Sequence, residues 1–253
     1  MAWIKQNVYL ATIPISMVIS IVWTISVRAN SSTEFVGEQK LRTLISQKFI
    51  PPNRGRPPAT ADGATRGGCE KKNQPITPLM PKEKLGLTFN ERPTFYWHIS
   101  ESNTQAAEFL LLDDNDDLVY EANLTLPKKP GIFAFTLPSE APGLKSNKQY
   151  HWYLSIKCSS EETDDTVTVE GWVERTKPNL ATQIKLNKLE PKYRSQIYAD
   201  AGIWHEAMRN VVQQRCINPY DSTIMLYWNQ LLTSVGLNQV VSESLDNVCT
   251  MKK

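Results

Sequence analysis

The sequence predicts a mainly β protein, in which a β-sandwich is followed by a small C-terminal helical region. Three observations predict this. First, apolar side chains alternate along one run, as in a strand with one buried face, and they are Tyr150, Trp152, Leu154, Ile156 and Cys158. Second, further short β-like runs separated by turn residues fill residues 74–178. Third, the apolar spacing becomes helical after Pro178.

The strands of the sandwich are expected at short intervals between residues 74 and 178. Their ranges are 76–79, 85–89, 94–99, 107–112, 118–124, 131–137, 150–158 and 166–175. Many short strands with Asn, Asp, Pro and Gly turns favour a sandwich over a parallel α/β sheet. In the third range, Phe95, Trp97 and Ile99 share one face, so Trp97 is expected in the core. Leu144, a polar turn and Tyr150 resemble the corner of immunoglobulin-like and fibronectin type III sandwiches.

The helical region is expected at residues 185–253. Helical spacing covers 193–215, interrupted at Gly202, and then 221–234 and 238–247. The run Gly202-Ile-Trp-His-Glu-Ala207 resembles the inter-helix turn of a tetratricopeptide repeat. Gly202 and Gly236 are 34 residues apart, which is the length of that repeat. Two such units are fewer than a free-standing solenoid needs, so we expect a small four-helix, tetratricopeptide-like cap packed against the sandwich.

The N-terminal segment predicts export. Residues 1–29 form a signal peptide pattern, with Lys5, an apolar run at 8–27 and small residues before a cleavage point after Ala29. The apolar run is also long enough to span a bilayer as an uncleaved anchor, which would serve as a membrane tether. Either alternative places the rest of the chain outside the cytoplasm, in the periplasm or secreted. Residues 30–73 are rich in Pro, Gly and Arg and are expected to form a linker.

The cysteines predict two disulfides in an exported chain. They are Cys69, Cys158, Cys216 and Cys249, and pairing within each region is the simplest arrangement. Buried free thiols are the alternative. No two cysteines have the short spacing of a metal site.

Charge and motifs narrow the function classes. The formal net charge of +2 belongs to Lys5 and Arg28, and the chain beyond residue 29 is neutral, which argues against nucleic acid as a partner. The sequence lacks common motifs of hydrolases, metalloproteases and phosphate-binding loops. His98 and His151 alternate with Trp97 and Trp152, so we expect them on exposed strand faces. No catalytic residue and no cofactor are therefore assigned.

Two stretches are candidate binding sites. Trp172 lies between Glu170 and Glu174 on one strand face, and it is interpreted either as an interface with the C-terminal helices or, with Tyr96 and Tyr153, as a sugar- or peptide-binding surface. The acidic stretch 113–117 is the second candidate.

In that acidic stretch, Asp113, Asn115 and Asp117 have the alternating oxygens of a calcium loop. However, Leu118 and Leu124 replace the glycine and glutamate of such loops, and this favours an ordinary hairpin turn without metal.

Several strings resemble one family in combination. They are F-I-P-P-N-R-G-R-P-P, G-A-T-R-G-G-C69, R-P-T-F-Y-W97, Y150-H-W-Y-L-S-I-K-C158, E170-G-W-V-E-R175 and Y198-A-D-A-G-I-W-H-E-A207. Across residues 48–245 the layout resembles the cyanobacterial domain-of-unknown-function family numbered 928. The resemblance implies export and a cyanobacterial origin, and it supplies no activity and no catalytic residues.

Together these observations predict an exported, non-enzymatic module of the cell envelope with a structural or protein–protein interaction role. The expected partner is another exported or envelope protein. The alternative is a glycan-binding module that uses exposed aromatic side chains.

Overall fold

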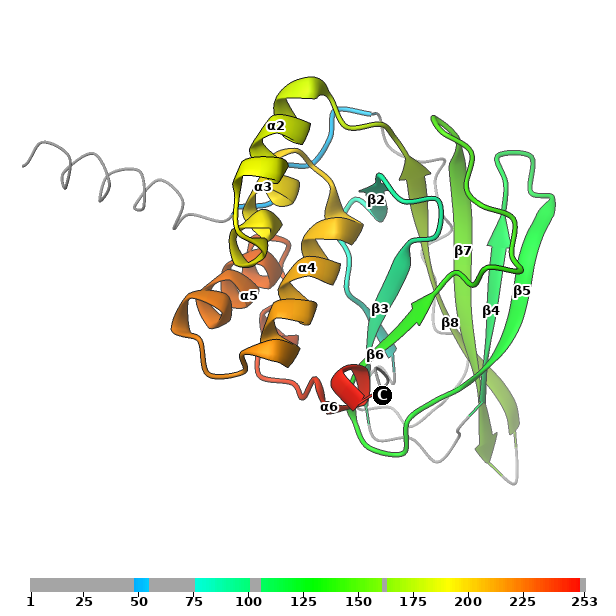
Figure 1. The fold of residues 1–253 in the computed structure, drawn as a ribbon. Helices are drawn as coiled ribbons and strands as arrows, with labels where there is room; N and C mark the ends of the chain where they lie inside the picture. The colour runs from blue at the N-terminus through cyan, green and yellow to red at the C-terminus, as the bar shows by residue number, and fades with distance from the viewer. Residues whose placement is uncertain (1–47, 55–75, 101–105, 161–162, 251–253) are drawn as a thin grey trace, which may run out of the picture. The chain divides into compact units, whose positions relative to one another are not determined.

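The two longest strands form the centre of the larger sheet. The computed structural model describes residues 48–54, 76–100, 106–160 and 163–250, apart from the side chains of residues 157–160 and 163–165. Strands β7 (Gln149–Ser160) and β8 (Thr163–Arg175) pair antiparallel along their whole length (Figure 1). The predicted alternation is confirmed, because Trp152, Leu154 and Ile156 are all buried.

Eight strands in two sheets lie within a few residues of the predicted ranges in the described part of the chain. The five-stranded sheet has the order β2 (Leu85–Thr88), β8, β7, β4 (Ala106–Leu112) and β5 (Leu118–Thr125). The three-stranded sheet has the order β1 (Ile76–Pro78), β3 (Thr94–Ile99) and β6 (Gly131–Thr136). All pairings within these sheets are antiparallel except that of β2 with β8. The long connection between β2 and β8 permits this parallel pair.

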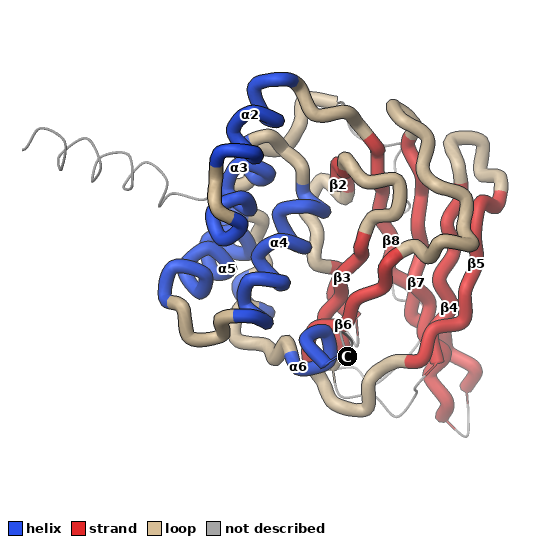
Figure 2. The backbone as a smooth tube through the Cα atoms, in the orientation of Figure 1, coloured by secondary structure: helices blue, strands red, loops and turns tan. Residues whose placement is uncertain are grey.

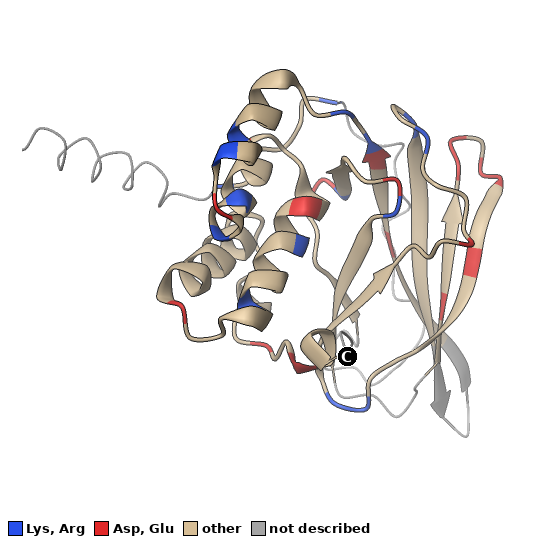
Figure 3. Ribbon diagram, viewed as in Figure 1, with Lys and Arg blue, Asp and Glu red and all other residues tan. Residues whose placement is uncertain are grey.

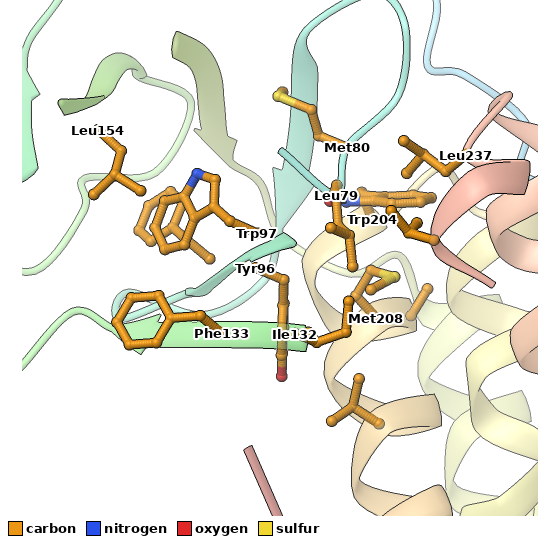
Figure 4. Close-up of a cluster of buried hydrophobic side chains, with 14 of the residues drawn as sticks. Leu79, Met80, Tyr96, Trp97, Ile132, Phe133, Leu154, Trp204, Met208 and Leu237 are labelled. Atoms are coloured by element: carbon orange, nitrogen blue, oxygen red, sulfur yellow. Dashed lines mark hydrogen bonds between the residues drawn. The ribbon is translucent and has the colours of Figure 1, made fainter. Parts of the chain in front are cut away.

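The sheets face each other across an aromatic core. The Trp97 side chain has 0% exposure, and its ring lies 5.6 Å from that of Trp152 on the opposite sheet. Phe95 and Phe109 also meet across the two sheets, with 5.2 Å between their ring centroids. Figure 4 shows Trp97 beside Phe133 and Leu154. The predicted core position of Trp97 is confirmed.

The predicted corner is also present. Leu144 is buried, and the Lys145 backbone N–H donates a hydrogen bond of 2.9 Å to the Tyr150 hydroxyl. This bond joins the start of β7 to the turn before it. The Arg175 guanidinium donates to the Leu144 carbonyl at 2.7 Å and so ties the same turn to the end of β8.

The helical region differs from the prediction at both ends, and strand and helix contents are closer than "mainly β" implies (Figure 2). The α-helices in the described residues are α2 (Leu180–Lys188), α3 (Arg194–Asp200), α4 (Trp204–Ile217), α5 (Ser222–Ser234) and α6 (Asp246–Cys249). Short 3-10 turns occupy Pro191–Tyr193 and Asn238–Val240.

The prediction of a helix at residues 238–247 is therefore wrong. Adjacent β-branched residues at 240–241 and serines at 242 and 244 weaken helix propensity there. The missed helix is α2, which begins before the expected residue 185. Its signal is Asn179, whose side chain caps the helix by accepting from the Thr182 N–H.

Helix α4 attaches the helices to the sandwich. The Trp204 indole donates to the Leu79 carbonyl at 2.8 Å, and His205 Nδ1 lies 3.0 Å from the Thr94 carbonyl oxygen. Figure 4 shows Trp204 and Met208 packed beside Leu79. Since these side chains belong to one continuous cluster of buried residues, the helices and the sheets share a core. All described residues fall within one compact unit, Lys40–Lys253.

Glu206 completes the attachment. One of its carboxylate oxygens accepts hydrogen bonds from the Thr88 hydroxyl at 2.8 Å and from the backbone N–H groups of Phe89 and Asn90 at 3.0 and 3.1 Å. The side chain thus closes the β2–β3 turn. The Gly202–Ala207 run, expected as an inter-helix turn, also carries the contacts to the sandwich.

Residues 48–54, at the end of the expected linker, pack on the helices. The Phe49 ring meets Trp204 edge-on at 5.0 Å, and its backbone N–H donates to the Ser234 hydroxyl at 3.1 Å. The Ile50 N–H donates to the Ala199 carbonyl at 3.2 Å. Residues 1–47 and 55–75, which include the expected signal peptide and most of the linker, lie outside the described residues.

One predicted disulfide is confirmed. Cys216 at the end of α4 is bonded to Cys249 in α6, with 5.3 Å between the Cα atoms. Cys69 lies outside the described residues, and Cys158 lies in β7 without a described side chain. Among the described helices, none has the length and apolar character needed to cross a bilayer.

Candidate functional site

The outward face of β7 and β8 brings together three of the predicted binding residues. The antiparallel register places Tyr153 opposite Glu170 and His151 opposite Trp172. The His151 and Trp172 rings stack with 4.2 Å between centroids and 15° between planes. We call the group His151, Tyr153, Glu170, Trp172 and Lys84 the outer cluster.

Hydrogen bonds link the polar members of the outer cluster into a chain. The Lys84 ammonium lies 3.3 Å from one Glu170 oxygen, and His151 Nε2 lies 3.1 Å from the other. An ionised carboxylate only accepts hydrogen bonds, so in neutral His151 the proton is on Nε2. His151 Nδ1 then accepts from the Tyr153 hydroxyl at 2.9 Å.

Burial favours the neutral forms of His151 and Tyr153 in this hydrogen-bond network. It lowers the pKa of His151, against the opposing effect of Glu170, and it raises the pKa of Tyr153, with Glu170 and Asp116 adding to the rise. Both ring nitrogens of His151 are hydrogen-bonded within the outer cluster, Nε2 to Glu170 and Nδ1 to Tyr153. The outer cluster is suited to fixing β7 against β8, because its hydrogen bonds and its stacked rings join the two strands.

The outer cluster corrects one expectation about histidine. His151 was expected to be exposed, but its side chain is 6% exposed. The alternation correctly placed His151 on the face of β7 opposite to Trp152. On that face, however, Trp172 stacks on the ring, and Glu170 and Tyr153 bind its two nitrogens. His98 is half-buried rather than exposed, with Nε2 at 3.1 Å from a Glu243 oxygen.

The remaining predicted binding residues are separated from one another. Glu174 is buried and pairs with Arg54 at 3.4 Å, while the Gln149 amide donates to its other oxygen at 3.1 Å. Trp172 is 6% exposed, and its backbone N–H donates to the Lys84 carbonyl. The helices contact the sandwich at a different place, through Trp204, His205 and Glu206.

Tyr96 is not an exposed aromatic side chain. It lies on β3 with 7% exposure and faces α4 (Figure 4). The reason is that the three-stranded sheet is covered on its outward face by α4, which the strand pattern alone could not show. Tyr96 therefore cannot contribute to an open sugar-binding strip.

The acidic stretch 113–117 forms a hairpin turn. The Asp113 carboxylate accepts from the backbone N–H groups of Asn115 and Asp117 at 2.8 and 3.2 Å. Asp116 adopts a positive φ of 63°, which suits a turn. Asp114 pairs with Lys148 at 2.6 Å. Within the described part of the chain, no three His, Cys, Asp or Glu side chains are grouped to hold a metal ion.

Strand β5 is an open edge of the larger sheet. In the described residues its pairing partner is β4, so its other side lacks a strand. Val119, Tyr120 and Leu124 are half-buried against the core, and Tyr120 stacks on Phe135 of the facing sheet at 6.4 Å. Leu118 at the start of the strand is 56% exposed. The sandwich core therefore reaches the surface along β5.

Comparison with known proteins places the chain in a family. The family model for a domain of unknown function, DUF928, matches residues 61–245. The chain belongs to the DUF928 family. Searches of curated proteins and of solved structures gave no match.

In this DUF928 protein, sequence reasoning missed the partners of the predicted residues. Lys84 has a positive φ of 57° and reaches Glu170 from the turn before β2. Arg54 reaches Glu174 from the N-terminal segment. Neither contact has a local signal, because each joins residues far apart in sequence. The open edge at β5 has no local signal either, because β6 follows it in the sequence and only the strand order shows that β6 belongs to the other sheet.

Proposed function

We propose that this DUF928 protein is exported and acts as a non-catalytic interaction module of the cell envelope, binding an extended segment of another exported protein along β5. The proposed fold is an immunoglobulin- or fibronectin III-like sandwich with a tetratricopeptide-like helical region. The corner at Tyr150 and the core Trp97 support the first part. The turn at Gly202 between α3 and α4, followed by buried Ala207, supports the second.

The open edge of β5 is the observation that carries the proposal. Backbone N–H and C=O groups on a free strand edge can pair with an added strand, which gives affinity without a pocket. An added strand would also cover the half-buried Val119, Tyr120 and Leu124, as burial of apolar surface favours.

Charge narrows the chemistry of the partner. Glu121 is exposed on β5, and residues 113–117 place a group of carboxylates at one end of the strand. Figure 3 shows Asp and Glu on β5 and on the turn that precedes it. A partner segment with Lys or Arg beside an apolar alternation would complement this edge.

Site-specific crosslinking tests the proposal. A photo-reactive residue at exposed Asn123 of β5 should capture one protein in the native envelope, and the same residue at exposed Asn187 of α2 should not. Glu121→Lys should weaken the capture, whereas the matched reversal Glu190→Lys, at an exposed site before α3, should leave it unchanged.

The outcomes separate the alternatives. Equal capture from Asn123 and Asn187, or no capture from either, would refute binding along β5. Purified protein that retains cell-wall polysaccharide and no protein would instead favour the glycan-binding alternative. The structure lends little weight to that alternative, because Tyr96 and Trp172 are buried and Tyr153 is half-buried.

A further inference from the structure

A pocket of about 280 Å³ lies between the three-stranded sheet and α4, on the face of the sheet opposite the sandwich core. β3 and β6 contribute Thr94, Tyr96 and Thr136, α4 contributes Arg209 and Val212, and α6 contributes Val248. This volume is close to the lower end of the range for small-molecule sites.

The pocket has a polar mouth and a mainly apolar interior. Arg209 and Thr136 are exposed, whereas Tyr96 and Val212 are buried. The Thr94 and Thr136 hydroxyls are 2.8 Å apart and form a hydrogen bond on the sheet wall. A molecule in the pocket would thus meet polar groups at one end and methyl groups at the other.

Arg209 is the charged group of the pocket. Among the described residues it has no ion-pair partner, and no carboxylate lines the pocket with it. Its positive charge reaches the interior, because it opposes the rise in the pKa of Tyr96 that burial causes. A guanidinium presents a planar fork of N–H donors that matches a carboxylate.

We propose that this pocket binds a small carboxylate with an apolar body. The carboxylate pairs with Arg209 at the mouth beside the Thr136 hydroxyl. The apolar part lies against Val212, Ala134 and Val248, where it is removed from water. Nothing in this site involves β5, so the two proposals stand or fall separately.

The disulfide maintains one wall of the pocket. Cys216 lines the pocket on α4, and its bond to Cys249 holds α6, which carries Val248, beside it. The Ile132 N–H also donates to the Ser244 carbonyl at 2.8 Å and joins the segment before α6 to β6. Ligand binding is therefore expected to weaken when Cys216 and Cys249 are both replaced by Ser.

Amide chemical-shift titrations with three probes of similar size test the proposal. Phenylacetate, phenylacetamide and 2-phenylethylamine share a ring and differ in charge. Phenylacetate should bind about tenfold more tightly than the amide, the ratio expected for one charge-assisted hydrogen bond. The shifted amides should belong to residues 94–96, 134–136 and 209–216.

Matched variants locate the effect. Arg209→Gln should bring phenylacetate down to the affinity of the amide, and Arg209→Lys should retain part of the preference. Lys188→Gln removes the same charge from an exposed position on α2 and should change nothing. Ala134→Leu should fill the pocket and abolish binding of all three probes, with the fold checked by circular dichroism. Equal affinities for the three probes, or an unchanged affinity in Arg209→Gln, would overturn the proposal.

Discussion

Acidification should destabilise this protein through His205. The side chain is buried between α4 and the sandwich, and Nδ1 donates to the Thr94 carbonyl. Nε2 has no hydrogen-bond partner within the described residues, and a Cβ placed on Gly86 would lie 2.7 Å from it. Burial therefore lowers the pKa of His205 to about 4, from an ordinary value of 6.5.

The sign and size of the effect follow from proton linkage. A lowered pKa of the folded state means that the unfolded chain binds a proton first as the pH falls. The contribution of His205 is fully present above pH 6.5 and is lost as the pH falls towards 4. The shift corresponds to a loss of about 3 kcal/mol in the free energy of unfolding, of which about 2 kcal/mol is lost by pH 5.

Urea denaturation between pH 7.5 and 4 measures this contribution. His205→Asn is the matched variant, because its amide can replace the Nδ1 donor to Thr94 without titrating. The difference in the free energy of unfolding between wild type and variant should shrink by about 2 kcal/mol from pH 7 to pH 5. A difference that stays constant across this range would show that His205 is not buried and neutral in the folded protein.

Four further variants test other parts of the structure, each through the free energy of unfolding. Trp152→Ala should cost about 3–5 kcal/mol because it empties the centre of the core, and a variant that unfolds like wild type would contradict the packing. Tyr150→Phe should cost about 1 kcal/mol through the lost bond to the Lys145 N–H. Replacing Cys216 and Cys249 by Ser should cost about 3.7 kcal/mol in the chain-entropy model, and a reducing agent should abolish the difference. Burial raises the pKa of Glu206 above its ordinary 4.5, so its contribution is present below pH 4.5 and is lost as the pH rises; Glu206→Gln should gain stability relative to wild type with rising pH, and a reversed slope would be inconsistent with that burial.

The sequence predicted the secondary structure of each segment better than it predicted which side chains are buried by other segments. All eight strands and the Tyr150 corner follow from alternation and turn residues, which are local signals. The burial of His151 and Tyr96 could not be predicted, because what covers them comes from another strand or another layer. The same limit applies to the helix–sandwich contact, which was expected at Trp172 and is made by Trp204 and its neighbours.

The candidate sites show the same limit: features set within one strand were predicted, and features that need several elements were not. Glu170 and Trp172 were correctly predicted to share a face, since the period of a strand sets that, whereas the place of Tyr153 beside them depends on the β7–β8 register. Their enclosure depends on Lys84 and His151, whose positions require the register of two strand pairs. The pocket beside Arg209 is lined by four separate elements, β3, β6, α4 and α6, so no pattern within one segment could reveal it.

The parallel pairing of β2 with β8 has a consequence for the order of assembly. Leu85 pairs with Trp172, and in the described residues β2 has no other strand partner. A chain that emerges from its N-terminus during synthesis must therefore keep β2 unpaired until β8 has followed it. Because loop closure over such a distance slows folding, β2 is expected to join the sheet late, after the β7–β8 pair has formed.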